Sequence, residues 1–191
     1  MLVPRPETEL IVEIATELAD DGMVWRRIID VGTGSGCLAV ALATEFPRAQ
    51  LIAADTSRDA LAVARRNAER HGVAGRMTFV ESDVLDRVTD SAELIVANPP
   101  YLADGDVSRL QPEVALYEPR QALSAGPDGL AVITRLLQTA ASRLAAGGRL
   151  VVEFGYGQEG RVAALAESAG WRIIEIRRDL QQIPRTIVLG R

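Results

Sequence analysis

Short apolar segments alternate with amphipathic segments along most of this chain, and this alternation limits the folds available to it. Strands are expected over residues 27–31, 50–54, 77–80, 93–97 and 149–154, and helices over 7–20, 36–46, 58–71, 130–145 and 158–169. Such an order predicts right-handed crossovers and a parallel sheet covered on both faces. Residues 171–177 and 186–189 predict two more strands joined without a helix. We therefore predict an α/β Rossmann-like fold with a mostly parallel seven-stranded sheet and an antiparallel C-terminal strand.

Length and composition exclude several classes of protein. A chain of 191 residues with 48% hydrophobic and 25% charged residues fits one ordinary globular domain. Its apolar runs are too short to span a bilayer, and the opening residues do not resemble a signal peptide. A net charge of −5 weakens the case for nucleic-acid binding without excluding it. The single cysteine, Cys37, precludes an intrachain disulfide or a cysteine metal cluster, so we expect no metal.

A glycine-rich loop follows the first expected strand. In the stretch Asp30-Val-Gly-Thr-Gly-Ser-Gly36, glycine recurs at alternate positions after an acidic residue. Glycine lets a backbone approach a ligand closely, and the next helix begins with free N–H groups. A dinucleotide fingerprint would need glycine in place of Cys37, whereas the observed spacing resembles the S-adenosylmethionine loop of class I methyltransferases. The alternative is a tight strand–helix turn that binds nothing.

Acidic residues follow the next two expected strands. Asp55 ends the second strand, where a carboxylate can accept both hydroxyls of a ribose. The alternative is that Asp55 caps the following helix, with Thr56 and Ser57 as rivals. Asp83 follows the third strand, where a methyltransferase acid usually contacts the adenine amino group and the next residue, Val84, touches the ring. The alternative for Asp83 is a turn aspartate.

The fourth expected strand ends in Asn98-Pro99-Pro100-Tyr101. Because proline has no backbone N–H, these residues neither extend a sheet ladder nor start a helix. The Asn98 side-chain oxygen and the Pro99 carbonyl can hold the two hydrogens of a planar –NH2 group, and Tyr101 offers a flat face. Such an arrangement would aim the nitrogen lone pair at a methyl donor by positioning, without a strong base. The alternative is a proline-rich turn.

Three further stretches carry a resemblance that covers essentially the whole chain. They are VPRPETE at residues 3–9, LYEPRQAL at 116–123, and Arg178-Asp179 followed by VLGR at 188–191. Together with NPPY they resemble the HemK/PrmC family of protein-glutamine methyltransferases, which modify peptide chain release factors. The resemblance implies methyl transfer from S-adenosylmethionine, giving S-adenosylhomocysteine, to the glutamine of a Gly-Gly-Gln motif.

The resemblance also implies a role for each site residue. Cofactor contacts are expected from Asp30, Gly32, Thr33, Gly34, Ser35, Gly36, Asp55, Asp83, Val84 and Asn98. Asn98, Pro99 and Tyr101 are expected to be catalytic, and together with Pro100 they should bind the substrate glutamine. The alternatives are an amino-group methyltransferase of nucleic acid with the same NPPY signature, and a cofactor-binding domain without a substrate.

The whole chain, residues 1–191, is expected to form one methyltransferase domain, in which residues 1–22 provide a lead-in segment and the first helix. The family carries a small helical domain before this segment, so part of the release-factor docking surface is expected to lie outside this sequence. We expect a cytoplasmic monomer that binds release factor but neither nucleic acid nor membrane. Trp25 and Trp171 are expected in the core, and His71 at a helix end. Cys37 is expected to be packed at the start of the second helix, where the helix N-terminus could lower the pKa of its thiol.

Overall fold

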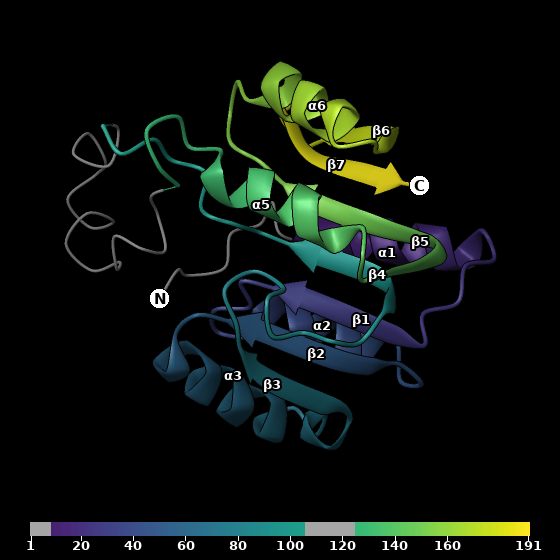
Figure 1. Cartoon of the computed structure of the whole chain (residues 1–191). Coiled ribbons are helices and arrows are strands. Elements are labelled where there is room, and N and C mark those ends of the chain that lie inside the picture. Colours follow the sequence, from purple (N-terminus) through teal and green to yellow (C-terminus); the bar gives the residue numbers. More distant parts are fainter. Residues whose placement is uncertain (1–8, 106–124) are drawn as a thin grey trace.

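A seven-stranded sheet forms the centre of the molecule, with strand order β3-β2-β1-β4-β5-β7-β6 (Figure 1). The computed structural model describes residues 9–105 and 125–191. β1 to β5 run parallel, and β7 is antiparallel to both β5 and β6, which confirms the predicted fold class. The strands are β1 (Arg27–Val31), β2 (Gln50–Asp55), β3 (Met77–Glu81), β4 (Ala92–Ala97), β5 (Leu144–Glu153), β6 (Arg172–Arg178) and β7 (Pro184–Gly190).

Helices cover both faces of this sheet. One face carries α1 (Glu9–Asp20), α2 (Cys37–Glu45) and α3 (Arg58–Arg70), and the other carries α5 (Ala131–Ala140) and α6 (Glu159–Ser168). A short 3₁₀ turn, η2 (Ala74–Arg76), precedes β3. No helix within the described ranges is long and apolar enough to cross a membrane.

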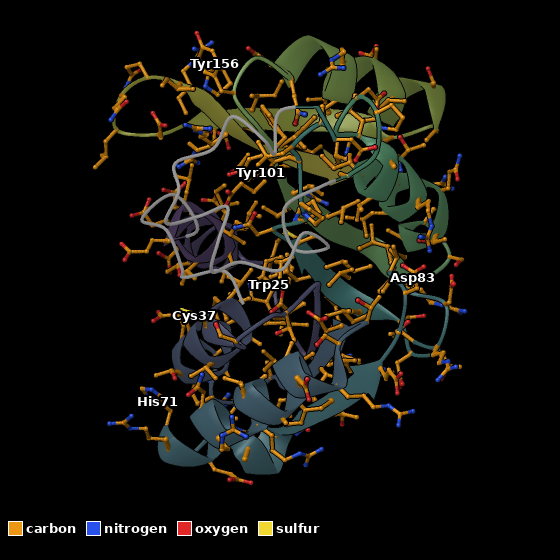
Figure 2. The ribbon with its side chains drawn as sticks, turned by 90° about the vertical axis from the view of Figure 1, so that its left-hand side faces the viewer. Trp25, Cys37, His71, Asp83, Tyr101 and Tyr156 are labelled. Carbon is orange, nitrogen blue, oxygen red and sulfur yellow. The ribbon has the colours of Figure 1, made fainter. Side chains whose placement is uncertain are left out.

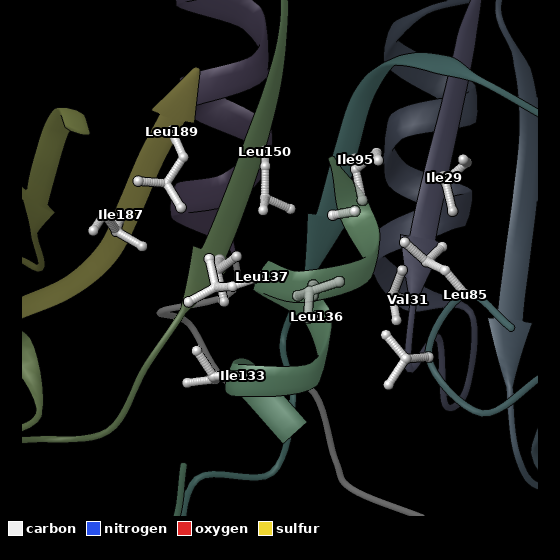
Figure 3. Close-up of a cluster of buried hydrophobic side chains, with 14 of the residues drawn as sticks. Ile29, Val31, Leu85, Ile95, Ile133, Leu136, Leu137, Leu150, Ile187 and Leu189 are labelled. Carbon is white, nitrogen blue, oxygen red and sulfur yellow. The ribbon is translucent and has the colours of Figure 1, made fainter. Parts of the chain in front are cut away.

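The two faces divide the apolar residues of each strand between two cores. Ile29 and Ile95 pack with α5 on one side of the sheet (Figure 3). Their neighbours Ile28 and Leu94 pack with α1 and α2 on the other side. Successive side chains of a strand point to opposite faces, so a buried parallel strand must be apolar at every position. This is why the central strands β2 and β4 each contain an unbroken run of four apolar residues.

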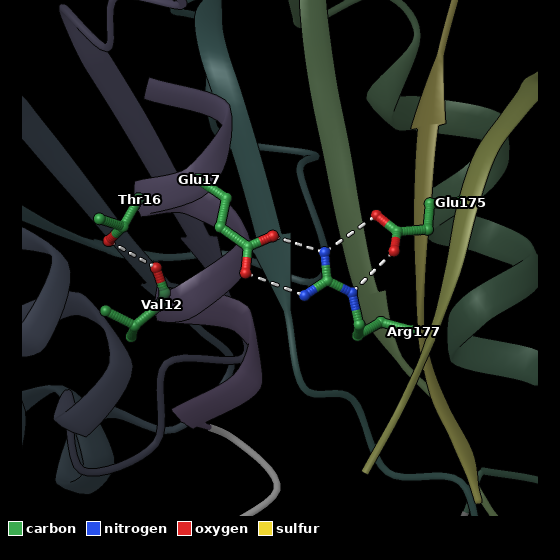
Figure 4. Close-up of polar contacts among 5 residues, drawn as sticks. All are labelled: Val12, Thr16, Glu17, Glu175 and Arg177. Atoms are coloured by element: carbon green, nitrogen blue, oxygen red, sulfur yellow. Dashed lines mark hydrogen bonds and ion pairs between the residues drawn. The ribbon is translucent and has the colours of Figure 1, made fainter. Parts of the chain in front are cut away.

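Two side-chain contacts hold the first helix, α1, in place. The Trp25 indole N–H donates to the Ala15 carbonyl at 3.0 Å, and Trp25 is buried as predicted. The Arg177 guanidinium of β6 pairs with Glu17 of α1 and with Glu175 (Figure 4). The paired Arg177 lowers the pKa of Glu17, chiefly through its hydrogen bonds. These contacts hold α1 against the segment before β1 and against the edge strand β6.

The prediction of a helix over residues 130–145 was wrong at its C-terminal end. α5 stops at Ala140, the chain turns through residues 141–143, and β5 begins at Leu144. The alanine-rich sequence favours a helix locally, but Leu144 pairs with Ala92 of β4, and this tertiary pairing overrides the propensity. Gly147 and Gly148 lie within a register shift of β5.

The C-terminal stretch Arg178-Asp179 closes the turn between β6 and β7. The Asp179 carboxylate accepts hydrogen bonds from the N–H groups of Gln181 and Ile183 and from the Arg185 guanidinium. These donors lower the pKa of Asp179, with the Ile183 N–H making the largest contribution. The turn lies beside the carboxyl end of β5, because Phe154 N–H donates to the Arg185 carbonyl.

Candidate functional site

A cavity of about 510 Å³ opens at the carboxyl ends of β1, β2, β3 and β4. Its lining includes nine of the ten residues predicted to contact a cofactor, namely Asp30, Gly32, Thr33, Gly34, Ser35, Asp55, Asp83, Val84 and Asn98. Pro99 and Pro100 line the same cavity, whereas Gly36 and Tyr101 do not. Parallel strands bring their carboxyl ends to one edge of the sheet, which gathers residues from four separate stretches. Figure 2 labels Cys37, Asp83 and Tyr101, which lie at separate places around this edge of the sheet.

Asp55 connects the ends of β2 and β1. One carboxylate oxygen, Oδ2, accepts from Gly34 N–H at 2.8 Å, and the other, Oδ1, accepts from Ser57 N–H at 2.8 Å. The N-cap of α3 is Ser57, whose hydroxyl accepts from Ala60 N–H. The alternative of Asp55 as the helix cap is therefore wrong. Each carboxylate oxygen has a second lone pair, so Asp55 can accept two more hydrogen bonds.

The buried pair Asp30 and Thr33 stabilises the glycine loop. Asp30 is 1% exposed and accepts a hydrogen bond from the Thr33 hydroxyl at 2.6 Å. Burial raises the pKa of Asp30 to about 7, partly offset by the Thr33 hydrogen bond, and nearby Asp55 raises it further. From the side, the Asn67 amide of α3 donates to the Ser35 carbonyl at 2.9 Å. The loop is thus held in shape by hydrogen bonds within the protein, made by Asp30 and Asn67.

Gly36 belongs to the packing behind the loop. Its backbone is left-handed, with φ +78°, and a Cβ placed there would lie 2.8 Å from the Ala64 Cβ of α3. Real side chains do not approach so closely, so only glycine lets α2 begin against α3. Gly36 does not line the cavity, and its predicted cofactor contact stays a prediction.

The end of β3 contributes an acidic side chain and a strained residue. Ser82 N–H donates to the Asp55 carbonyl, which fixes this turn to β2. Val84 is 6% exposed and has φ +49°, a left-handed conformation that is rare for a β-branched residue. Asp83 forms an ion pair with Arg135 of α5 at 2.8 Å, and this contact raises the pKa of Arg135. No local pattern in the sequence predicts that Arg135 pairs with a site residue.

The NPPY segment begins at the cavity wall and continues to Tyr101, which does not line the cavity. Within residues 9–105 and 125–191, no donor is hydrogen-bonded to the Pro99 carbonyl, so that oxygen can accept. Tyr101 lies beyond the cavity, where its own carbonyl accepts from the Gln158 amide at 2.8 Å. Gln158 was predicted only as a helix residue, and it is the N-cap residue of α6.

Several residues that line the cavity were not predicted from the sequence as site residues. They are Val31, Cys37, Leu38, Thr56, Ser57, Asp59, Ala60, Val63, Ser82, Ala97, Val132 and Leu136. Most of them follow directly after a strand or lie in the first turns of α2 and α3, and that position is the signal that could have found them. The thiol of Cys37 is exposed, and its pKa is raised by partial burial and by the charges of Asp30 and Glu9. The expectation that Cys37 is packed was wrong, and the pKa of its thiol is not lowered.

Two other predictions, for Trp171 and His71, are confirmed, and two concern stretches outside the described residues. Trp171 is buried in the core, where its N–H donates to the Leu137 carbonyl, and His71 caps the C-terminus of α3. The PRP stretch before residue 9 and the LYEPRQAL stretch at 116–123 lie outside the described residues. Among the residues that the structure describes, no group of three or more acidic, histidine or cysteine side chains is placed to hold a metal ion.

Proteins of similar sequence and structure were found for this chain. A release factor glutamine methyltransferase of Geobacter sulfurreducens is 43% identical over 172 residues, covering 90% of this chain and 59% of that protein. One of Cereibacter sphaeroides, with the same description, is 43% identical over 186 residues, covering 97% of this chain and 65% of that protein. This chain therefore spans less than two thirds of the length of these relatives.

A solved structure and a family model agree with the observed architecture. The catalytic domain of hMettl16, in complex with the MAT2A 3′UTR hairpin 6, matches with a TM-score of 0.74 and 16% identity, over 99% of this chain and 72% of that one. At this identity the likeness concerns the fold. The family model described as "Methyltransferase small domain" matches residues 8–126. Because that match covers more than half of the sequence, the chain belongs to the methyltransferase small domain family.

Proposed function

We propose that this chain transfers a methyl group from S-adenosylmethionine to the side-chain amide nitrogen of the glutamine in the Gly-Gly-Gln motif of peptide chain release factors. The observation that carries the proposal is that Asp55 and the pair Asn98–Pro99 line one cavity. The acid expected to bind the ribose and the expected acceptors for an –NH2 group thus line the same cavity. The proposal treats residues 1–191 as a single catalytic domain.

The residues of the cavity fit S-adenosylmethionine. A volume of about 510 Å³ lies within the range of roughly 300–1,000 Å³ that small-molecule sites occupy. Asp55 retains lone pairs for two ribose hydroxyls, and the glycine loop would hold the methionine part. Asp83 and Val84 would lie at the adenine, where the left-handed Val84 turns its backbone at the cavity wall. When bound, the cofactor supplies an electrophilic methyl group on a sulfonium sulfur.

The chain's own part in the reaction is to present the substrate nitrogen. An amide nitrogen is a poor nucleophile because its lone pair is delocalised into the carbonyl group. The Asn98 side-chain oxygen and the Pro99 carbonyl oxygen would each accept one N–H of the substrate –NH2 group. These two acceptors fix the plane of the amide and stabilise the positive charge that develops on nitrogen during transfer. The residues thereby aim the nitrogen at the cavity that holds the cofactor.

A protein substrate is favoured over nucleic acid. The two relatives described above carry the name release factor glutamine methyltransferase at 43% identity, whereas the RNA-bound hMettl16 domain shares only 16%. The net charge of −5 also disfavours nucleic-acid binding, which depends on basic side chains that displace counterions from the phosphates. We therefore propose release factor as the partner. The site uses no metal in this scheme, since hydrogen bonds and positioning supply the catalysis.

The proposal is tested by label transfer from methyl-labelled S-adenosylmethionine. The substrates are a release factor, the same factor with the motif glutamine replaced by glutamate, and ribosomal or transfer RNA. We expect label only in the unaltered release factor. Label in RNA would favour the nucleic-acid alternative, and cofactor binding without transfer to any substrate would favour a binding module.

A further inference from the structure

The Gln158 side chain joins two loops that are distant in sequence. It is 5% exposed, and its Oε1 accepts from Gly155 N–H at 2.8 Å while its Nε2 donates to the Tyr101 carbonyl at 2.8 Å. Gly155 follows β5, and Tyr101 follows β4, so this one amide connects the ends of two adjacent strands. Both functional groups of the amide are engaged in making this connection.

Two glycines let the loops approach Tyr101 closely. A Cβ at Gly129 would lie 2.4 Å from the Tyr101 carbonyl oxygen, and a Cβ at Gly155 would lie 2.8 Å from Cδ2 of the Tyr101 ring. Side chains cannot be accommodated at such distances. The Tyr101 carbonyl is therefore held by Gln158 in a space that only a glycine at position 129 leaves open, and its ring lies against Gly155. We call Gly129, Gly155 and Gln158 the Tyr101 cradle.

The residues on the C-terminal side of Tyr101 are also tied to the cradle. Ala125 N–H donates to the Leu102 carbonyl at 2.9 Å, and Asp104 N–H donates to the Gly126 carbonyl at 3.0 Å. Gly129 N–H in turn donates to the Gly126 carbonyl. The segment that carries Tyr101 is thus anchored to the residues leading into α5.

On the other side, Tyr101 is linked to the acceptors of the proposed site by a stiff connection. Pro99 and Pro100 have φ fixed by their rings, so few torsions separate Tyr101 from the Pro99 carbonyl. A shift of the Tyr101 backbone would consequently move that carbonyl, together with Asn98. Misplacement of reacting groups by about 1 Å can cost about 10²-fold in rate.

We propose that Gln158 is a positioning residue for methyl transfer, which acts through the Tyr101 backbone to set the acceptor geometry of Asn98 and Pro99. This inference rests on the proposed function for its kinetic consequence. Gln158 does not line the cofactor cavity. Its effect should accordingly fall on catalysis much more than on cofactor binding.

The test compares Gln158→Met with a matched control, Gln138→Met, at an exposed position of α5. Methionine has nearly the length of glutamine but neither donates to the Tyr101 carbonyl nor accepts well from Gly155 N–H. A second variant, Gln158→Glu, keeps the acceptor for Gly155 but removes the donor to Tyr101. For each protein we would measure kcat with release factor, the Kd of S-adenosylhomocysteine, and amide hydrogen exchange.

We expect kcat to fall about 10- to 100-fold in both Gln158 variants, as misplaced reacting groups require, and not in Gln138→Met. The Kd of S-adenosylhomocysteine should change much less than kcat. Amide exchange should accelerate over residues 101–105 and stay the same over residues 32–36. An unaltered kcat, or an equal acceleration of exchange in both segments, would overturn the inference.

The exchange measurement separates this inference from the proposed function. If the unaltered chain methylated no release factor, the proposed function would fail, yet exchange over residues 101–105 would still report whether Gln158 holds this segment. Unchanged exchange there in Gln158→Met would overturn the positioning role whatever the substrate.

Discussion

The Oδ2 atom of Asp55 accepts the backbone N–H of Gly34 at 2.8 Å, which ties the end of β2 to the glycine loop after β1. This bond places a carboxylate from one strand beside the loop of its neighbour. Asp55 consequently has two tasks in our account, since it shapes the loop and retains lone pairs for the ribose hydroxyls. Both tasks would be lost together if the side chain were removed.

Replacing Asp55 with alanine should weaken the binding of S-adenosylhomocysteine by about 1–3 kcal/mol, because the hydroxyls and Gly34 N–H lose their acceptor. Isothermal titration calorimetry measures this change directly. Asp20→Ala, an exposed position at the end of α1, serves as the control. Equal affinities of Asp55→Ala and the unaltered chain, or tight NADH binding with no response to the methyl donor, would contradict the assignment.

Gly36→Ala should destabilise the fold more than Gly72→Ala does. Both glycines have a left-handed backbone, with φ of +78° and +71°, so both substitutions incur the strain of alanine in that region, about 1–2 kcal/mol. Only at Gly36 would the new Cβ meet the Ala64 side chain, at 2.8 Å, whereas nothing lies within 4 Å at Gly72. Overpacking of this kind costs about 1–3 kcal/mol more. Urea denaturation of the two variants measures the difference, and equal losses would show that α2 and α3 separate freely.

The sequence indicated the site well where a local pattern carried the information. Apolar strands that end in Asp55 or in Asn98-Pro99 are visible as runs followed by polar residues, and the order of strands then places their ends along one edge. The end of α5 was not visible in this way, because Leu144 pairs with Ala92, 52 positions earlier in the chain. The same limit applies to Gln158, whose partner Tyr101 is 57 residues away. Local composition cannot report contacts made over such separations.

The stability of the fold should depend on pH through Asp30. Its pKa is about 7 in the folded chain against an ordinary value of 3.8, so between these values the folded protein holds a proton that the unfolded chain has released. The free energy of unfolding should therefore fall as pH rises through this range, by about 3–5 kcal/mol from this group. Below pH 3.8 both states are protonated, and above about 7 both are ionised, so the dependence ends there.

Asp30→Asn isolates this dependence, since asparagine does not titrate but can still accept from the Thr33 hydroxyl. Urea denaturation at about pH 4.5 and about pH 7.5 should show that the unaltered chain loses more stability than the variant across this interval. Parallel losses in the two proteins would mean that the Asp30 carboxyl is ionised throughout.

In the proposed reaction, Asn98 holds the amide of the release-factor glutamine for methyl transfer. Asn98→Ala removes one of two preorganised acceptors, so kcat should fall by about 10²–10³, by analogy with loss of one oxyanion-hole donor. The affinity for S-adenosylhomocysteine should change much less.

The most direct measurement is tandem mass spectrometry of a release factor treated with S-adenosylmethionine and either the unaltered chain or Asn98→Ala. We predict one added methyl group, localised to the side-chain nitrogen of the Gly-Gly-Gln glutamine, and nearly absent with the variant. Methylation at any other residue, or equal methylation of the glutamine by both proteins, would contradict the account.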